Sequence, residues 1–140
     1  MAVSGPAWVK EGLREAADAL LKDDATPEDK EIFLFSNDAT VSDASVNADF
    51  TEITTNGGEK ATLTKATFAV ATDADPVVSR WNSTTGKVWN ITGDLTIYGW
   101  AIRGVTSTKI YCAENWGVNT VANGNTVTVQ PLDIQFDIPE

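Results

Sequence analysis

Apolar side chains recur at helical spacing in the first part of the chain. The segment from Ala7 to Leu21 has charged residues on one face and an apolar stripe on the other, with Pro6 placed to fit a first helical turn. The stripe consists of Leu13, Ala16, Ala17, Leu20 and Leu21. The polar run Lys22–Lys30 ends the helix. We therefore expect residues 1–30 to form a short amphipathic α-helix and a linker, with the helix packed on its own sheet or on a neighbouring subunit.

From Glu31 onward the pattern is that of short strands separated by turns. A long polar loop over Ser36–Asp49 interrupts it, and the phase break within 61–72 indicates a bulge or two short strands. Strands are expected at 32–35, 50–54, 61–72, 77–81, 87–91, 95–103, 108–115 and 126–138. Strands of this length and spacing predict a mainly β domain over residues 31–140, an antiparallel β-sandwich of jelly-roll-like type.

Local signals also predict which strands pair. A Gly-containing loop between Val77–Trp81 and Lys87–Ile91 indicates a hairpin, and Asn123-Gly124 is the strongest short hairpin signal in the chain. In the last strand the alternation changes phase at Pro131, which indicates a bend where the strand passes from one sheet to another.

The segment Leu95–Arg103 is apolar on both faces. Strict alternation places Leu95, Ile97 and Ala101 on one face and Tyr98, Trp100 and Ile102 on the other. A sandwich strand usually shows one face to water, so we expect the N-terminal helix or another subunit to cover this one. Interfaces favour Tyr and Trp. The interface candidates are Trp8, Leu13, Leu20, Tyr98, Trp100, Ile102 and Trp116.

The composition argues against several classes of function. A net charge of −10 over 140 residues disfavours contact with nucleic-acid phosphates or an anionic membrane. The chain has no histidine, so imidazole catalysis and the commonest metal ligand are excluded. Cys112 is the only cysteine and is expected to be a small buried hydrophobe. No apolar run is long enough for a membrane span, and no signal-peptide pattern is present, which predicts folding in a cytosol-like compartment.

The acidic residues give no convincing catalytic or metal site. Asp133 and Asp137 lie on the polar phase of the last strand and should face water. The Asp73-Ala74-Asp75 turn lacks the glycine and the distal glutamate of a calcium loop. We therefore expect no catalytic residue, no cofactor and no metal.

Five tryptophans in a domain of this size need an account. Trp81 and Trp89 flank the predicted hairpin and could pair across it, either to pack a core or to stack on a sugar. The sequence leaves both readings open.

Several segments together resemble a family of small bacteriophage virion proteins. They are Leu34-Phe35-Ser36-Asn37, Ala48-Asp49-Phe50-Thr51-Glu52, Ile97-Tyr98-Gly99-Trp100, Tyr111-Cys112-Ala113-Glu114-Asn115-Trp116, Ala122-Asn123-Gly124-Asn125 and the final alternating strand. The resemblance covers most of residues 31–138. It implies a jelly-roll-like structural protein similar to cement or decoration proteins, which clamp major capsid subunits.

The leading hypothesis is thus a non-enzymatic capsid cement protein on the exterior of the virion, assembled in the host cytoplasm. Its partners would be the major capsid protein and further copies of itself, as a dimer or trimer, and neither nucleic acid nor a membrane. A tail, baseplate or fibre component of the same virion is the second hypothesis. A carbohydrate-binding module that uses Trp81 and Trp89 is the third.

Overall fold

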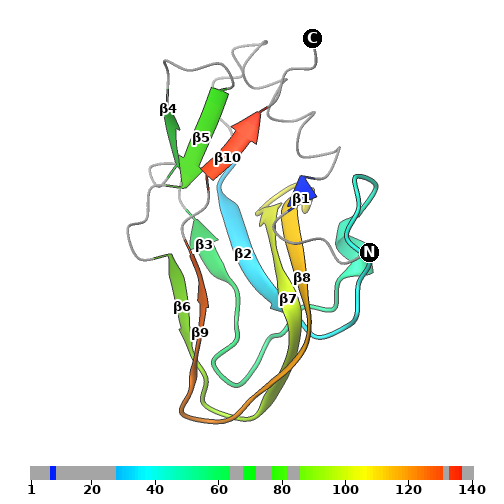
Figure 1. The fold of residues 1–140 in the computed structure, drawn as a ribbon, viewed down its shortest axis with the longest axis vertical. Helices are drawn as coiled ribbons and strands as arrows, with labels where there is room; N and C mark the ends of the chain where they lie inside the picture. The colour runs from blue at the N-terminus through cyan, green and yellow to red at the C-terminus, as the bar shows by residue number, and fades with distance from the viewer. Residues whose placement is uncertain are drawn as a thin grey trace.

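The protein is built from antiparallel β-sheets, as Figure 1 shows. The computed structural model describes residues 28–63 and 86–130 in full, and beyond them the strand backbones at 7–8, 68–71, 77–81 and 133–136. Its elements are β1 (Ala7–Trp8), β2 (Lys30–Phe35), the 3-10 turn η1 (Asn47–Asp49), β3 (Ala61–Leu63), β4 (Phe68–Ala71), β5 (Val77–Trp81), β6 (Lys87–Asn90), β7 (Leu95–Gly104), β8 (Ile110–Val121), β9 (Thr126–Val129) and β10 (Asp133–Phe136). The mainly β prediction is confirmed.

The described strands form three sheets. The largest has the order β1-β8-β7-β2-β3, a second has the order β10-β5-β4, and the third is the pair β6-β9. Strand pairs that lie in different sheets are nested along the sequence. β7 pairs with β8, the paired strands β6 and β9 flank them, and the paired strands β5 and β10 flank those in turn. β9 and β10 lie in different sheets on either side of Pro131, which confirms the predicted crossing. The segment 61–72 contains two short strands, β3 and β4. Of the two predicted alternatives, a bulge or two short strands, the second is therefore confirmed.

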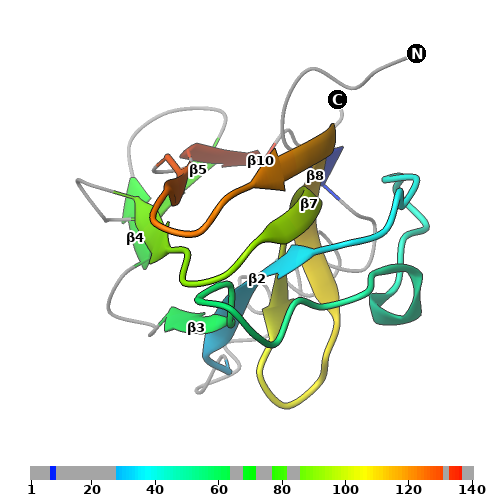
Figure 2. The same cartoon turned by 90° about the horizontal axis from the view of Figure 1, so that it is seen from below.

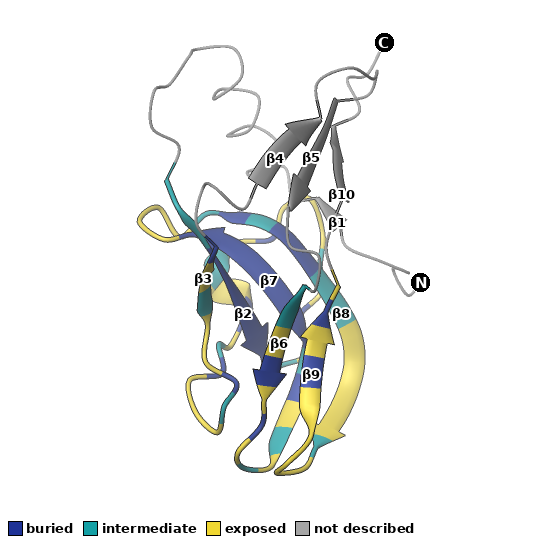
Figure 3. Cartoon of the chain, turned by 90° about the vertical axis from the view of Figure 1, so that its left-hand side faces the viewer, coloured by how far each residue is buried: buried dark blue, intermediate teal, exposed yellow. Residues whose placement is uncertain are grey.

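Strands β2 and β7 lie at the centre of the large sheet and are buried on both faces (Figure 3). One face packs against β6 and β9 in what we call the sandwich core, formed by Ile32, Leu34, Ile53, Leu63, Trp89, Ile91, Ile97, Trp100, Ile102, Cys112, Val127 and Val129. The other face packs against the loop after β2 in the loop-side core, formed by Phe33, Phe35, Ala39, Phe50, Ala101, Ile110 and Ala113. Figures 1 and 2 show the elements that carry these cores, the β6–β9 pair and the loop after β2, on opposite sides of the sheet.

The chain itself therefore covers both faces of the central strand. The loop after β2 covers one face and β6 with β9 cover the other, so a second subunit is not needed as cover at 95–103; the predicted N-terminal helix lies outside the described residues. Phe50, from the loop, packs edge-on against Phe33 at a centroid distance of 6.2 Å and is tilted against Phe35 at 5.0 Å. Aromatic pairs at such distances are favourable packing arrangements. A long loop that carries its own aromatic residue thus replaces the external partner.

The predicted alternation within β7 also needs correction. Ile97 shares the sandwich core with Trp100 and Ile102, and Tyr98 packs against the loop-side core with Ala101. The cause is an irregularity in the β7–β8 register between Ile97 and Gly99, which changes the phase of the strand.

Gly99 marks the place where two neighbours come closest to β7. A Cβ at this position would collide with the Glu114 carbonyl oxygen and would lie 2.6 Å from Phe35 Cζ. The space left by the missing side chain is therefore filled by β8 and by the loop-side core, not by an external group.

Both predicted hairpins are wrong, although their strands exist. β5 pairs with β4 and β10 and not with β6. The Asn123-Gly124 turn forms, but β8 and β9 lie in different sheets. Gly124 donates its N–H to the Ile91 carbonyl oxygen at 2.8 Å, which ties the turn to the β6–β7 connection. Turn chemistry fixes the local reversal, and the two apolar layers decide the partners.

Two further predictions fail where the structure can test them. Ala7–Trp8 is a strand that pairs with Ala113 and Cys112, so the predicted helix does not begin there. The rest of that helix, Leu13 and Leu20 included, lies outside the described residues. The expected strand at 50–54 is reduced to a single bridge between Phe35 and Glu52. Within the described residues, no helix is long and apolar enough to cross a membrane.

Candidate functional site

The distal half of β8 bulges out of the large sheet. The register moves from Gly99–Asn115 to Ile97–Asn119, so β8 has two more residues than β7 across this stretch. Gly117 takes a φ of +79°, which favours glycine. Its N–H donates to Asn115 Oδ1 at 2.7 Å, and its carbonyl oxygen accepts from Asn119 Nδ2 at 3.1 Å. The two asparagines thus hold the bulge in place.

The bulge presents apolar side chains to solvent. Trp116 is 38% exposed and Val118 is 65% exposed, the highest value among the large hydrophobic residues that the structure describes. Next to Trp116 is an open groove of about 350 Å³ between β8 and β9. Its lining residues are Ile97, Trp116, Asn119, Val121, Thr126, Val127 and Thr128. Trp116 therefore lies exposed in the wall of the groove, whereas Val118 lies on the opposite face of β8, because its neighbour Asn119 is paired with Ile97 on the sandwich side.

This surface carries no formal charge. From Asn115 to Leu132 the sequence contains no Asp, Glu, Lys or Arg, whereas the whole chain has 20 acidic and 10 basic residues. We call its exposed residues around the groove, Trp116, Asn119, Thr126 and Thr128, the neutral face. Exposed strand edges are usually protected by charged side chains or by bulges, and among the described residues it is the bulge that interrupts the edge of β8.

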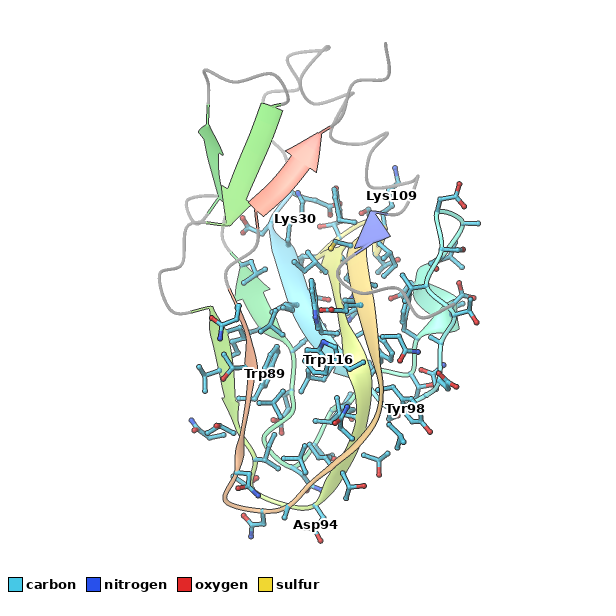
Figure 4. The ribbon with its side chains drawn as sticks, viewed as in Figure 1. Lys30, Trp89, Asp94, Tyr98, Lys109 and Trp116 are labelled. Atoms are coloured by element: carbon cyan, nitrogen blue, oxygen red, sulfur yellow. The ribbon has the colours of Figure 1, made fainter. Side chains whose placement is uncertain are left out.

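The predicted interface residues separate into different environments. Trp100 and Ile102 are 1% and 2% exposed inside the sandwich core, so they are not an interface. Tyr98 is half-buried on the loop side, and Trp116 is exposed on the groove side; Figure 4 shows them on opposite sides of the large sheet. Of Trp8 only the backbone is described, within β1.

Sequence reasoning missed Val118, Gly117 and the two asparagines that support the bulge. A single exposed valine in a strand carries no pattern of its own. The signal that could have found them is the long charge-free stretch, which is unusual in a chain of net charge −10.

A buried ionic cluster is the strongest electrostatic feature of the described residues. Arg103 Nε donates to Glu31 Oε1 at 2.7 Å, and its terminal nitrogens donate to Glu52 Oε2 at 2.7 Å and to Asn47 Oδ1 at 2.9 Å. The guanidinium also lies over the Phe33 ring, 4.5 Å from its centroid. Burial disfavours the charged form, but the hydrogen bonds to Glu31 and Glu52 outweigh it and raise the pKa of Arg103. Each charge is paired, so the cluster fastens the loop to the sheet.

Glu28 caps the turn after β7. Its Oε2 accepts the N–H groups of Thr106 at 2.8 Å and Ser107 at 2.9 Å, and its Oε1 accepts the Ser107 hydroxyl. Partial burial acts to raise the pKa of this carboxyl, but the hydrogen bonds from Ser107 and Thr106 lower it overall.

Replacing Glu28 by Gln is expected to lower the free energy of unfolding at pH 7 by less than about 1 kcal/mol, because the group is partly exposed. The folded-state pKa lies below the ordinary value of 4.5. The stabilisation is therefore present above that value and is lost as the pH falls through the folded-state pKa. Urea unfolding of parent and variant at pH 7 and at about pH 3 should show the difference shrinking in acid. A difference of equal size at both pH values would contradict this, and Glu59→Gln at an exposed position is the control.

Cys112 is 3% exposed in the sandwich core, and the prediction that it is a buried hydrophobe is confirmed. Burial, with a smaller effect of Glu114, raises the pKa of its thiol to about 12. The thiolate that would attack an electrophile or bind a metal is therefore scarce at neutral pH. Among the residues whose side chains are described, no group of three or more His, Cys, Asp or Glu could hold a metal ion.

The proposed sugar-binding pair does not form. Trp89 pairs with Val127 and Trp81 with Phe68, in different sheets. Trp89 is 2% exposed, and its indole Nε1 donates to the Glu59 carbonyl oxygen at 2.8 Å. Its ring faces the core, where it cannot stack on a sugar.

Comparison of the chain with protein-family models, with curated proteins and with solved structures gives no significant match.

Proposed function

We propose that the chain is a non-enzymatic structural protein of a bacteriophage virion, a cement or decoration protein that binds across major capsid subunits. Its partners would be the major capsid protein and further copies of itself. The observation that carries the proposal is the neutral face, where Trp116 lies exposed beside a groove on an otherwise acidic chain. Exposed apolar side chains gathered in this way are typical of protein–protein contact.

The placement of the family-like segments supports the proposal. Leu34-Phe35 ends β2, Ile97–Trp100 lies within β7, and Tyr111–Trp116 lies within β8. These strands are neighbours in the large sheet, so segments far apart in sequence form one continuous region. Along the sequence, β5 and β10 enclose β6 and β9, which in turn enclose β7 and β8, and each enclosing pair is hydrogen-bonded. This nested pairing supports a jelly-roll-like sandwich.

The acidic exterior fits the same role. A net charge of −10 keeps free copies soluble and repels nucleic acid, so that association depends on the neutral face. The helix predicted up to Leu21 would add Leu13 and Leu20 as a second contact. Each contact would be modest, and their number on a shell would supply the stabilisation.

Binding to particles tests the proposal. The full-length chain is mixed with shells assembled from the major capsid protein of the same phage, then sedimented and imaged by cryo-electron microscopy. We expect density at the joints between capsomers and shells that release their contents at a higher temperature.

A chain that binds neither shells nor tails would overturn the proposal. Density on the tail, baseplate or fibre of intact particles would replace the cement role by the second hypothesis.

A further inference from the structure

We propose that the free edge of β9 binds an extended, uncharged segment of the major capsid protein, which joins β6 and β9 as an added strand. This inference rests on the proposed function, and it names the chemistry of the partner at the neutral face. The juxtaposition that carries it is an unpaired strand edge beside an uncharged, partly apolar groove.

The groove runs along the edge of β9 that faces away from β6. Thr126, Val127 and Thr128 line it in succession, together with residues of β7 and β8. No residue of β6, which is described in full, contributes to the lining. Figure 3 shows β9 between β6 and β8. Among the described strands β9 pairs with β6 alone, so its other edge opens into the groove.

Backbone donors and acceptors point into the groove from this edge. Ile91 donates its N–H to the Asn125 carbonyl oxygen at 2.9 Å, which fixes the phase of the ladder between β6 and β9. Hydrogen-bonded and non-hydrogen-bonded pairs alternate along an antiparallel ladder. The N–H and C=O groups of Thr126 and Thr128 therefore point away from β6, and among the described residues they have no backbone partner. Such a row of unpaired groups is a template for another strand.

The groove also selects the side chains of the added strand. Ile97 and Val127 are buried in its lining, and the Trp116 ring is exposed in its wall. From Asn115 to Leu132 the chain carries no charge, so a charged side chain placed in the groove would lose water without gaining an opposite charge. Alternate side chains of a strand point to the same face. We therefore expect an uncharged segment with an apolar residue at every second position.

The edge of β9 lacks the features that usually prevent strand addition. Exposed edges are commonly blocked by charged side chains, by proline or by a bulge. β9 has the sequence Thr-Val-Thr-Val and a regular register with β6, whereas the nearby edge of β8 is interrupted by its bulge. A second copy of the chain is the poorer occupant, because two copies with a net charge of −10 repel each other.

Replacing Thr128 by Pro tests the backbone contact in the full-length chain. Proline removes the N–H that faces the groove and takes no hydrogen bond from the ladder with β6. In sedimentation with shells of the major capsid protein of the same phage, we expect Thr128→Pro to bind about 10-fold more weakly than the parent. Thr128→Val is the matched control, because it retains the N–H, and it should bind as the parent does. Circular dichroism checks that both variants are folded.

Cryo-electron microscopy of the parent chain on these shells gives a readout that decides the matter even if the proline variant does not fold. We expect an extended segment of the capsid protein beside β9 at the strand spacing of about 4.8 Å. Contact through another surface, or equal binding by the two Thr128 variants, would overturn this inference and leave the proposed function standing.

Two further outcomes also count against the inference. A chain that binds no shell would overturn the cement role together with this inference. A dimer of the free chain in sedimentation velocity that Thr128→Pro abolishes would assign the edge of β9 to a second copy, and the capsid segment would then not be its occupant.

Discussion

Replacing Arg103 by Met is expected to lower the free energy of unfolding by about 3–5 kcal/mol, because it leaves the buried carboxylate of Glu31 without its buried cation. Arg103 is 7% exposed and Glu31 is 5% exposed, and the guanidinium also bonds Glu52 and Asn47 from the loop. Methionine retains the length of the side chain but supplies none of these hydrogen bonds. Chemical denaturation followed by circular dichroism measures the loss.

Lys60 provides the control within the same cluster. Its Nζ lies 3.2 Å from Glu31 Oε1, but its side chain is 48% exposed. Lys60→Ala should therefore cost less than about 1 kcal/mol. If the two variants lost equal stability, the buried position of Arg103 would not be the cause.

Replacing Trp100 by Ala is expected to cost about 3–5 kcal/mol, because the side chain fills the sandwich core and its removal leaves a cavity. Trp100 is 1% exposed, and its indole Nε1 donates to Glu114 Oε2 at 2.9 Å. The same denaturation experiment measures this effect. A small loss would mean that the residue is not the centre of the core.

Trp116→Ala is the matched control, with the same substitution two residues after Glu114 at a position that is 38% exposed. In the dilute monomer it should cost less than half of what Trp100→Ala costs, since its ring is open to water on one side. The pair of variants thus separates a tryptophan of the core from a tryptophan of the surface, which sequence pattern alone had placed together.

Much of the fold follows from short-range pattern. The apolar run at 32–35, the two-faced segment at 95–103 and the phase change at Pro131 correspond to β2, β7 and the passage from β9 to β10. These features depend on alternation and on proline geometry, which act within a few residues.

Pairing depends on contacts between distant residues and could not be read in the same way. The turn at Asn123-Gly124 has the right chemistry for a hairpin, but Trp89 and Val127 gain more burial by pairing β9 with β6. Phe50 covers one face of β7, and it lies far along a polar loop whose composition does not indicate a core residue. The bulge at Gly117 could not be predicted, because it depends on hydrogen bonds from the side chains of two asparagines that resemble ordinary loop residues in the sequence.

The nested pairs also bear on the order in which the chain can fold. The short turn after Gly104 lets β7 meet β8 with little loss of chain entropy. Once they meet, the ends of β6 and β9 are already close, and their pairing in turn brings β5 near β10. β2 joins β7 from more than 60 residues away, as its Lys30 is paired with Gly104, so the centre of the finished sheet closes a longer loop than any of the nested pairs. The deeply buried β2 thus loses more chain entropy when it joins the sheet than the strands of the nested pairs do.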